Sequence, residues 1–199
     1  MRRAPLHRLR AVARRPRRAA GRAEAPARVT ATGAPWLSHR AGRLIGALVA
    51  VVLGSLGTVA PALDVPYLAG RVNDLARVLS PAARDRLEAK LRDLEQRTGA
   101  QVAVLVIPSL EGESLEAYSV RVAQTWKLGR KGVDDGVLFL VAKNDRKMRI
   151  EVGYGLEPRL TDALSRQILD DQVRPRFRNN DFDGGIEAGV DAIGAVIEG

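Results

Sequence analysis

The chain of 199 residues contains no cysteine and only two histidines, His7 and His39. Without cysteine it can form no disulfide framework, no thiolate zinc site and no cysteine nucleophile. Both histidines lie before residue 44, so the remainder of the chain has none. This absence excludes Ser–His triads, histidine-ligated metals and phosphohistidine chemistry from that remainder.

Acidic residues are scarce at the N-terminus, where positive charge accumulates. Residues 1–43 hold 12 Arg and a single acid, Glu24. Because the net charge of the whole chain is +9, residues 44–199 carry a net charge of −2. Nucleic-acid-binding domains need a positive excess, so we do not expect nucleic acid as a partner.

Residues 1–43 are rich in Arg, Ala and Pro and show no apolar periodicity, which is typical of a disordered leader. The alternative is a mispredicted start. Translation that began at Val29 or Leu37 would leave a leader of conventional length.

Residues 44–63 form a long uncharged stretch that follows Arg40 and Arg43, whose charges favour a cytoplasmic N-terminal side. Its apolar part has the length of a signal-peptide core, and Ala60-Pro61-Ala62 supplies a small-x-small cleavage site. We predict export to the periplasmic or extracellular face of the membrane, with cleavage after Ala62. The alternative is an uncleaved single-span anchor, because the stretch reaches the ~20 residues needed to cross a bilayer.

Residues 64–199 alternate helical and strand patterns and make up the predicted domain. Ser80 and Pro81 begin a helix that carries Leu87, Leu91 and Leu94 on one face and ends at Thr98-Gly99. We expect strands at 101–107, 136–142 and 148–152, a helix after Ser114, a helix from Thr161 to Pro175 and a last helix that begins at 181–183.

The connections between these elements predict the sheet. A right-handed crossover through the helix after Ser114 sets strands 101–107 and 136–142 parallel. The turn at 144–146 sets strand 148–152 antiparallel to its neighbour. The predicted fold class is α/β, as a three-layer α/β/α sandwich with a small mixed sheet flanked by helices.

Acidic residues gather on turns and strand ends between Asp134 and Asp162. Asp134 and Asp135 precede a buried strand, Glu157 follows the Gly153-Tyr154-Gly155 turn, and Asp162 begins a helix. Hard oxygen ligands on separate loops suit a divalent cation, and neighbouring acids on flexible turns favour calcium over magnesium. The alternative is that these residues serve as turn residues and helix caps.

Two further patterns have simpler interpretations. The segment 179–184 resembles the start of an EF-hand loop, but Val190 stands where the bidentate Glu is needed, so we expect a helix cap. Arg146, Lys147 and Arg149 follow a turn, where a solvated edge is expected and phosphate contacts are the alternative.

Several sequence blocks occur together in one order. They are Val72-Asn73-Asp74-Leu75-Ala76, Thr98-Gly99-Ala100-Gln101, Gly129-Arg130-Lys131-Gly132, Asp134-Asp135-Gly136, Gly153-Tyr154-Gly155-Leu156-Glu157 and Leu160-Thr161-Asp162-Ala163. Together they resemble the TPM-domain family of exported or membrane-attached bacterial and thylakoid domains, over about residues 72–193. The resemblance implies a three-layer fold, calcium or magnesium binding and a weak acid phosphatase activity in some members, and it adds Asp74 to the expected metal ligands.

Two functions of different classes follow. The first is a non-catalytic module outside the cytoplasm that binds a divalent cation and engages membrane proteins or membrane-associated complexes in assembly or quality control. The second is a metal-assisted acid phosphomonoesterase in which Asp134 and Asp135 are the catalytic residues. The absence of histidine removes the easiest general acid near neutral pH and favours the module.

Overall fold

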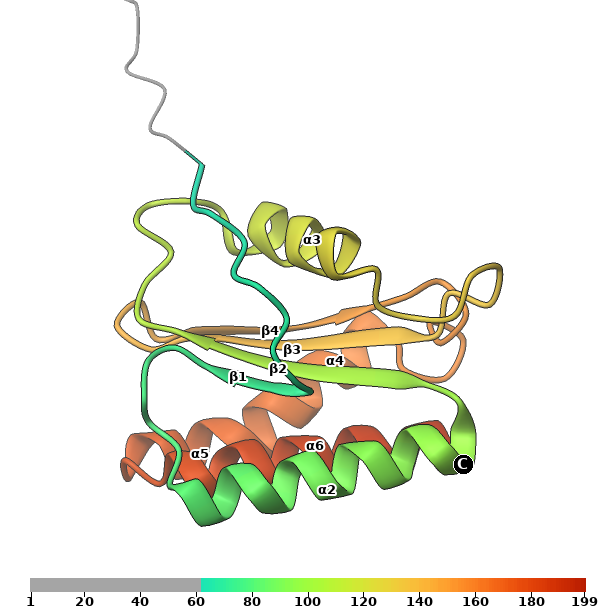
Figure 1. The fold of residues 1–199 in the computed structure, drawn as a ribbon. Coiled ribbons are helices and arrows are strands. Elements are labelled where there is room, and N and C mark those ends of the chain that lie inside the picture. Colours follow the sequence, from blue (N-terminus) through green and yellow to red (C-terminus); the bar gives the residue numbers. More distant parts are fainter. Residues whose placement is uncertain (1–61) are drawn as a thin grey trace, which may run out of the picture. The chain divides into compact units, whose positions relative to one another are not determined.

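The structure, a computed structural model, describes residues 62–199, which form one sheet with helices on both faces (Figure 1). The strands are β1 (Val72–Asp74), β2 (Gln101–Ile107), β3 (Gly136–Ala142) and β4 (Lys147–Val152). The helices are α2 (Pro81–Thr98), α3 (Leu115–Trp126), α4 (Asp162–Ile168), the π-helical turn η1 (Leu169–Val173), α5 (Arg174–Arg178) and α6 (Phe182–Glu198). The predicted α/β/α architecture is confirmed.

The sheet is mixed, with strand order β1-β2-β3-β4. β2 and β3 pair in parallel from Gln101 opposite Gly136 to Ile107 opposite Ala142, and β3 pairs with β4 in antiparallel fashion, as predicted. β1 was not predicted. Its three residues are too short for a periodic pattern, and it pairs with β2 in parallel, with Asp74 opposite Val106.

Alternate residues of each strand supply two hydrophobic cores. Val102, Val104 and Val106 of β2 face the larger core, which α2, α6 and the α4–η1 segment cover. The intervening residues, Ala103, Leu105 and Ile107, face a smaller core under α3. The helices of the two faces are therefore separate layers on one sheet that is buried from both sides (Figure 1).

The two crossover connections differ in hand. β1, β2 and β3 follow one another across the sheet in one direction, but α2, between β1 and β2, covers one face and α3, between β2 and β3, covers the other. Connections that advance in the same direction over opposite faces have opposite hands. One of them therefore departs from the strong right-handed preference of such units.

Local signals place the helix ends where they were expected. The side chains of Ser80, Ser114, Thr161 and Asp181 each accept a backbone N–H in the first turn of α2, α3, α4 and α6. Gly99 ends α2 in the left-handed conformation, with φ of 79°.

One predicted helix end is wrong. The helix that begins after Thr161 does not stop at Pro175, because Pro175 lies in the first turn of α5. Proline is tolerated there, since a backbone N–H in the first turn of a helix has no partner within that helix. η1 joins α4 to α5, and the helical path continues to Arg178.

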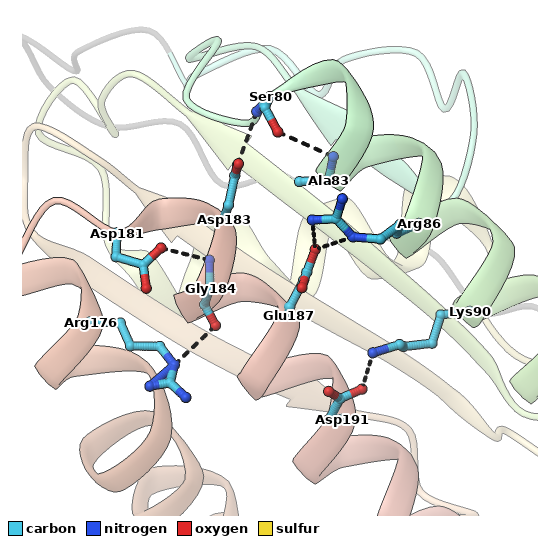
Figure 2. A network of polar contacts seen from close by, with 10 residues as sticks. All are labelled: Ser80, Ala83, Arg86, Lys90, Arg176, Asp181, Asp183, Gly184, Glu187 and Asp191. Atoms are coloured by element: carbon cyan, nitrogen blue, oxygen red, sulfur yellow. Dashed lines mark hydrogen bonds and ion pairs between the residues drawn. The ribbon is translucent and has the colours of Figure 1, made fainter.

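α2 and α6 run parallel and are joined by a row of charged pairs (Figure 2). Arg86 binds Glu187, Lys90 binds Asp191, and Arg97 binds Glu198, each pair separated by 101 positions. A constant separation is what two parallel helices in fixed register require. At the start of the row, the backbone N–H of Ser80 donates to Asp183 at 2.9 Å.

The leader and most of the apolar stretch 44–63 lie outside the described residues. The first described residues form an extended segment along α3, which we call the strap (residues 63–69). Its carbonyls at Leu63, Asp64 and Pro66 accept hydrogen bonds from Arg121, Tyr118 and Trp126. Between residues 62 and 199, no helix has the length and apolar character needed to span a membrane.

Candidate functional site

Four of the sequence blocks meet at one edge of the sheet, where β2 and β3 begin and β4 ends. We call this the motif edge: residues 99–101, 129–136 and 153–157. Gln101 and Gly136 are paired at the start of β2 and β3, and the Gly153 N–H donates to the Gly136 carbonyl at 2.7 Å. Gly136 thereby contacts one residue 35 positions before it and another 17 positions after it.

Asp135 is the buried charge of the motif edge, with 4% of its surface exposed. Its Oδ1 accepts the backbone N–H of Arg130 at 2.8 Å, and its Oδ2 accepts the Arg130 guanidinium Nε at 2.7 Å. Burial raises the pKa of the Asp135 carboxyl, but the hydrogen bonds and charge of Arg130 outweigh burial and lower that pKa below its usual value. Asp135 is therefore an ionised structural anchor for the turn at 130–135.

Glycines let the two turns of the motif edge approach closely. A Cβ on Gly155 would lie 1.9 Å from the Val133 carbonyl oxygen, and a Cβ on Gly153 would lie 2.2 Å from the Asp134 carbonyl oxygen. The Gly155 N–H donates to the same Asp134 carbonyl at 3.0 Å. The close approach of the two backbones thus explains both glycines of the Gly-Tyr-Gly block.

A polar network ties the motif edge to α2. Glu95 accepts hydrogen bonds from Arg71 and from the Gln101 side chain, and the Gln101 side-chain oxygen accepts the Gly129 N–H at 2.9 Å. The Arg130 guanidinium also lies over Gly99, where a Cβ would come within 2.5 Å of its central carbon. These contacts hold both turns against the body of the domain.

The interlocked turns expose two apolar side chains. Tyr154 is 78% exposed and Val133 is 46% exposed, beside the exposed acids Asp134 and Glu157. Asp134 has a left-handed backbone, with φ of 55°. Exposed aromatic and aliphatic groups on a rigid, charged frame are a common composition of protein-binding surfaces.

The expected metal ligands divide between different parts of the molecule. Asp134, Asp135 and Glu157 belong to the motif edge, whereas Asp74 ends β1 beside Val106, at the opposite edge of the sheet. Asp74 Oδ2 accepts the Leu79 N–H at 2.8 Å, while its Oδ1 is buried and accepts no hydrogen bond from the described residues.

Asp162 lies elsewhere again. It begins α4 and lines a separate cavity of about 260 Å³, together with Glu116 and Arg149. Within residues 62–199, no three acidic or histidine side chains converge into a group that suits a metal ion.

Sequence reasoning missed the part that Arg130 and Gln101 have at this edge. Both residues lie in the sequence blocks named above, but the sequence pattern indicates only a charged loop residue for Arg130 and the first residue of a strand for Gln101. The available signal was the pairing of one Arg with an Asp five positions later, next to a predicted buried strand. Such a carboxylate is expected to need a partner.

Comparison with known proteins agrees with this arrangement. The family model described as TPM domain matches residues 72–196. The solution structure of the N-terminal domain of a protein from P. gingivalis is similar with a TM-score of 0.64 and 31% sequence identity, over 68% of this chain and 89% of that one. No curated protein matches.

Two other solution structures share the fold at lower identity. The N-terminal domain of the cg2496 protein from Corynebacterium glutamicum has a TM-score of 0.51 and 17% identity, over 68% of this chain and 86% of that one. The BA42 protein from Bizionia argentinensis has a TM-score of 0.54 and 18% identity, over 62% and 84%. The family match spans more than half of the chain and includes every block that forms the motif edge, so the chain belongs to the TPM domain family.

Proposed function

We propose that this TPM domain is a non-catalytic binding module that acts outside the cytoplasm, where its motif edge engages a membrane protein or a membrane-associated complex. The observation that carries the proposal is the exposure of Tyr154 and Val133 on two turns that their glycines lock together. Tyr is among the residues that most often dominate binding energy at protein interfaces. Rigid turns lose little conformational entropy when they bind.

The metal-assisted phosphomonoesterase has less support from the same geometry. Both Asp135 oxygens are engaged by Arg130, which leaves Asp134 as the only exposed member of the predicted catalytic pair. A nucleophile or base would first have to break a buried, charge-assisted pair. We therefore expect no phosphatase turnover from this site.

Calcium remains part of the proposal as a ligand that modulates binding. Asp134 and Glu157 are exposed acids on the two interlocked turns, and all-oxygen ligands favour calcium or magnesium. Two carboxylates make a weak site, to which a partner's oxygen atoms would have to contribute. Asp74, with its buried Oδ1, and Asp162 are candidate ligands at separate places.

The experiment replaces Tyr154 in the full chain with a photo-crosslinking phenylalanine derivative in cells that produce the protein. The same derivative at Arg92, an exposed position of α2, is the matched control. We expect a discrete crosslinked membrane-fraction product from position 154 and none from 92, with a lower yield after calcium chelation. Equal products from both positions would refute the motif edge as the binding surface. Turnover of p-nitrophenyl phosphate that disappears with Asp134→Asn, a change at the exposed acid, would instead support the enzyme.

A further inference from the structure

A second surface feature lies at the opposite edge of the sheet, where β3 ends and β4 begins. A cavity of about 830 Å³ opens there between two walls. One wall is the β3–β4 turn with the start of β4, at 143–148, and the other is α5 with the turn into α6, at 174–182. We call it the basic cleft.

The basic cleft is lined by cations from both walls and by no acidic residue. The cations are Lys143, Arg146, Lys147, Arg174 and Arg178. Among the ion pairs of the described residues, only Arg174 of these five takes part, with Asp170 at 2.9 Å. Asp145 belongs to the same turn, but its carboxylate accepts the Leu110 N–H at 2.8 Å and does not line the cleft.

This concentration of charge contrasts with the rest of the domain. Residues 44–199 are net acidic, with a charge of −2, yet five cations converge on one cavity. Like charges held together repel one another, and a bound anion removes that repulsion. The cleft therefore has the electrostatics of an anion site.

The side chains also indicate the shape of the anion. Arg presents planar donors that match phosphate oxygens, and the amides of Asn144 and Asn180 add further donors to the lining. Phe177, Phe182 and Met148 supply an apolar part of the lining, and the two rings pack with centroids 5.0 Å apart. A phosphoryl group that carries an apolar substituent would use both kinds of surface.

The basic cleft lies where ligands commonly bind in open α/β sheets, beyond the carboxyl ends of the parallel strands. The cleft lies beside Val141 and Ala142, at the carboxyl end of β3. The motif edge lies at the other end of the same strand, so the two surfaces can act independently.

We propose that the basic cleft binds the phosphoryl group of an anionic ligand, supplied either by a phospholipid headgroup or by a free phosphate ester. Binding occurs without hydrolysis, because no acid, histidine or cysteine lines the cleft to attack or to transfer a proton. The proposal does not depend on the partner of the motif edge.

The test compares three forms of the full chain: wild type, Lys143→Gln/Lys147→Gln and Lys127→Gln/Lys131→Gln. The last pair removes the same charge from two exposed lysines away from the cleft, Lys127 at the end of α3 and Lys131 in the motif edge. Calorimetric titration with phenyl phosphate probes a free ester, and co-sedimentation with phosphatidylglycerol or phosphatidylcholine vesicles probes a lipid headgroup. Fluorescence emission and thermal unfolding show that each variant is folded.

We expect wild type and the Lys127/Lys131 variant to bind at least one of the two probes with the same affinity. The Lys143/Lys147 variant should bind that probe at least about tenfold more weakly. Saturable binding of phenyl phosphate identifies a free ester. Binding to phosphatidylglycerol vesicles that exceeds binding to phosphatidylcholine vesicles and is lost in the Lys143/Lys147 variant, with no binding of phenyl phosphate, identifies a lipid. The phosphatidylcholine vesicles measure any binding through residues 44–63, which all three forms share. Equal losses in both variants, or binding of neither probe, would overturn the proposal.

Discussion

Arg130 holds both oxygens of the Asp135 carboxylate, with its backbone N–H on Oδ1 and its guanidinium on Oδ2. The contact closes the turn that carries Asp134 and positions the first residue of β3. The expected catalytic pair of neighbouring acids is thereby divided into a structural residue and an exposed one.

Asp135→Asn should destabilise the domain at neutral pH, by about 1–3 kcal/mol, because a buried hydrogen-bonded charge is lost. The folded-state pKa of Asp135 is lowered, so its contribution is fully present above the unfolded value of about 3.9 and is lost as pH falls through the folded value. Urea unfolding between pH 7 and pH 3 measures both effects. Asp134→Asn is the control, since Asp134 is exposed and Asn tolerates its left-handed backbone. Similar losses in both variants would contradict the assignment.

Gly155→Ala should destabilise the domain by about 3 kcal/mol, because its Cβ would meet the Val133 carbonyl oxygen at 1.9 Å and neither backbone can move freely. Gly132→Ala is the comparison, since its φ of 78° strains an alanine but the space around it is open. We expect a cost of about 1 kcal/mol there. Thermal unfolding by circular dichroism ranks the two. An unchanged melting temperature for Gly155→Ala would show that the turns are not interlocked.

Removal of the strap should loosen α3. Leu63, Val65 and Leu68 pack against the core under α3, and the Trp126 indole N–H donates to the Pro66 carbonyl at 2.7 Å. A chain that starts at Gly70 should melt at a lower temperature and show red-shifted emission, compared with a chain that starts at Leu63. Trp126 is the only tryptophan in both, because the other tryptophan is Trp36. Identical emission from the two chains would mean that the strap does not cover Trp126.

The strap also carries a pH dependence. The Leu63 N–H donates to Glu113 at 2.9 Å, and the pKa of Glu113 is lowered, chiefly by its hydrogen bond with Arg121. Strap attachment should therefore be intact at neutral pH and weaken as pH falls through the folded pKa of Glu113. Trp126 emission of a chain that starts at Ala62, in which the Leu63 nitrogen remains a peptide N–H, should follow this change. Glu113→Gln should remove the pH dependence, and an unaltered titration in that variant would assign it to another group.

The charged row between α2 and α6 should contribute little to stability. Lys90 and Asp191 are both exposed, so a double-mutant cycle to alanine should give a coupling free energy below about 1 kcal/mol, smaller still in 1 M salt. Lys90→Glu should destabilise slightly, and Asp191→Lys in the same chain should restore the loss. A coupling of several kcal/mol would mean that the pair is desolvated in solution.

Structural features that depend on residues a few positions apart were predicted correctly from the sequence. Ser80, Ser114 and Thr161 cap helices because a side-chain oxygen reaches an N–H three positions later, and this contact exists in any chain that starts a helix there. The antiparallel β3–β4 pair follows from a short turn for the same reason. The predicted helix end at Pro175 was wrong because proline is found both after the ends of helices and in their first turns. Here η1 leads directly into α5, and Pro175 lies in the first turn of α5.

The candidate site was only partly predictable. The blocks that form the motif edge were recognised in sequence, but the distribution of Asp74, Asp162 and Asp134 over different places depends on where each strand begins and ends in the sheet. Of the basic cleft, only Arg146 and Lys147 were considered in sequence, where phosphate contacts were the alternative to a solvated edge. Its two walls lie about 30 residues apart, and the charges of each alone describe an ordinary solvated turn or helix.

The sequence by itself determined the three longer strands, the starts of the capped helices and the family, because these depend on local periodicity and on blocks in a fixed order. The tertiary structure decided which charges meet. It placed Arg130 on Asp135, set Asp74 at the far edge, and brought Lys143 and Arg178 to one cavity. Electrostatic interactions depend on distance and burial in three dimensions, and neither quantity can be calculated from the spacing of residues along the chain.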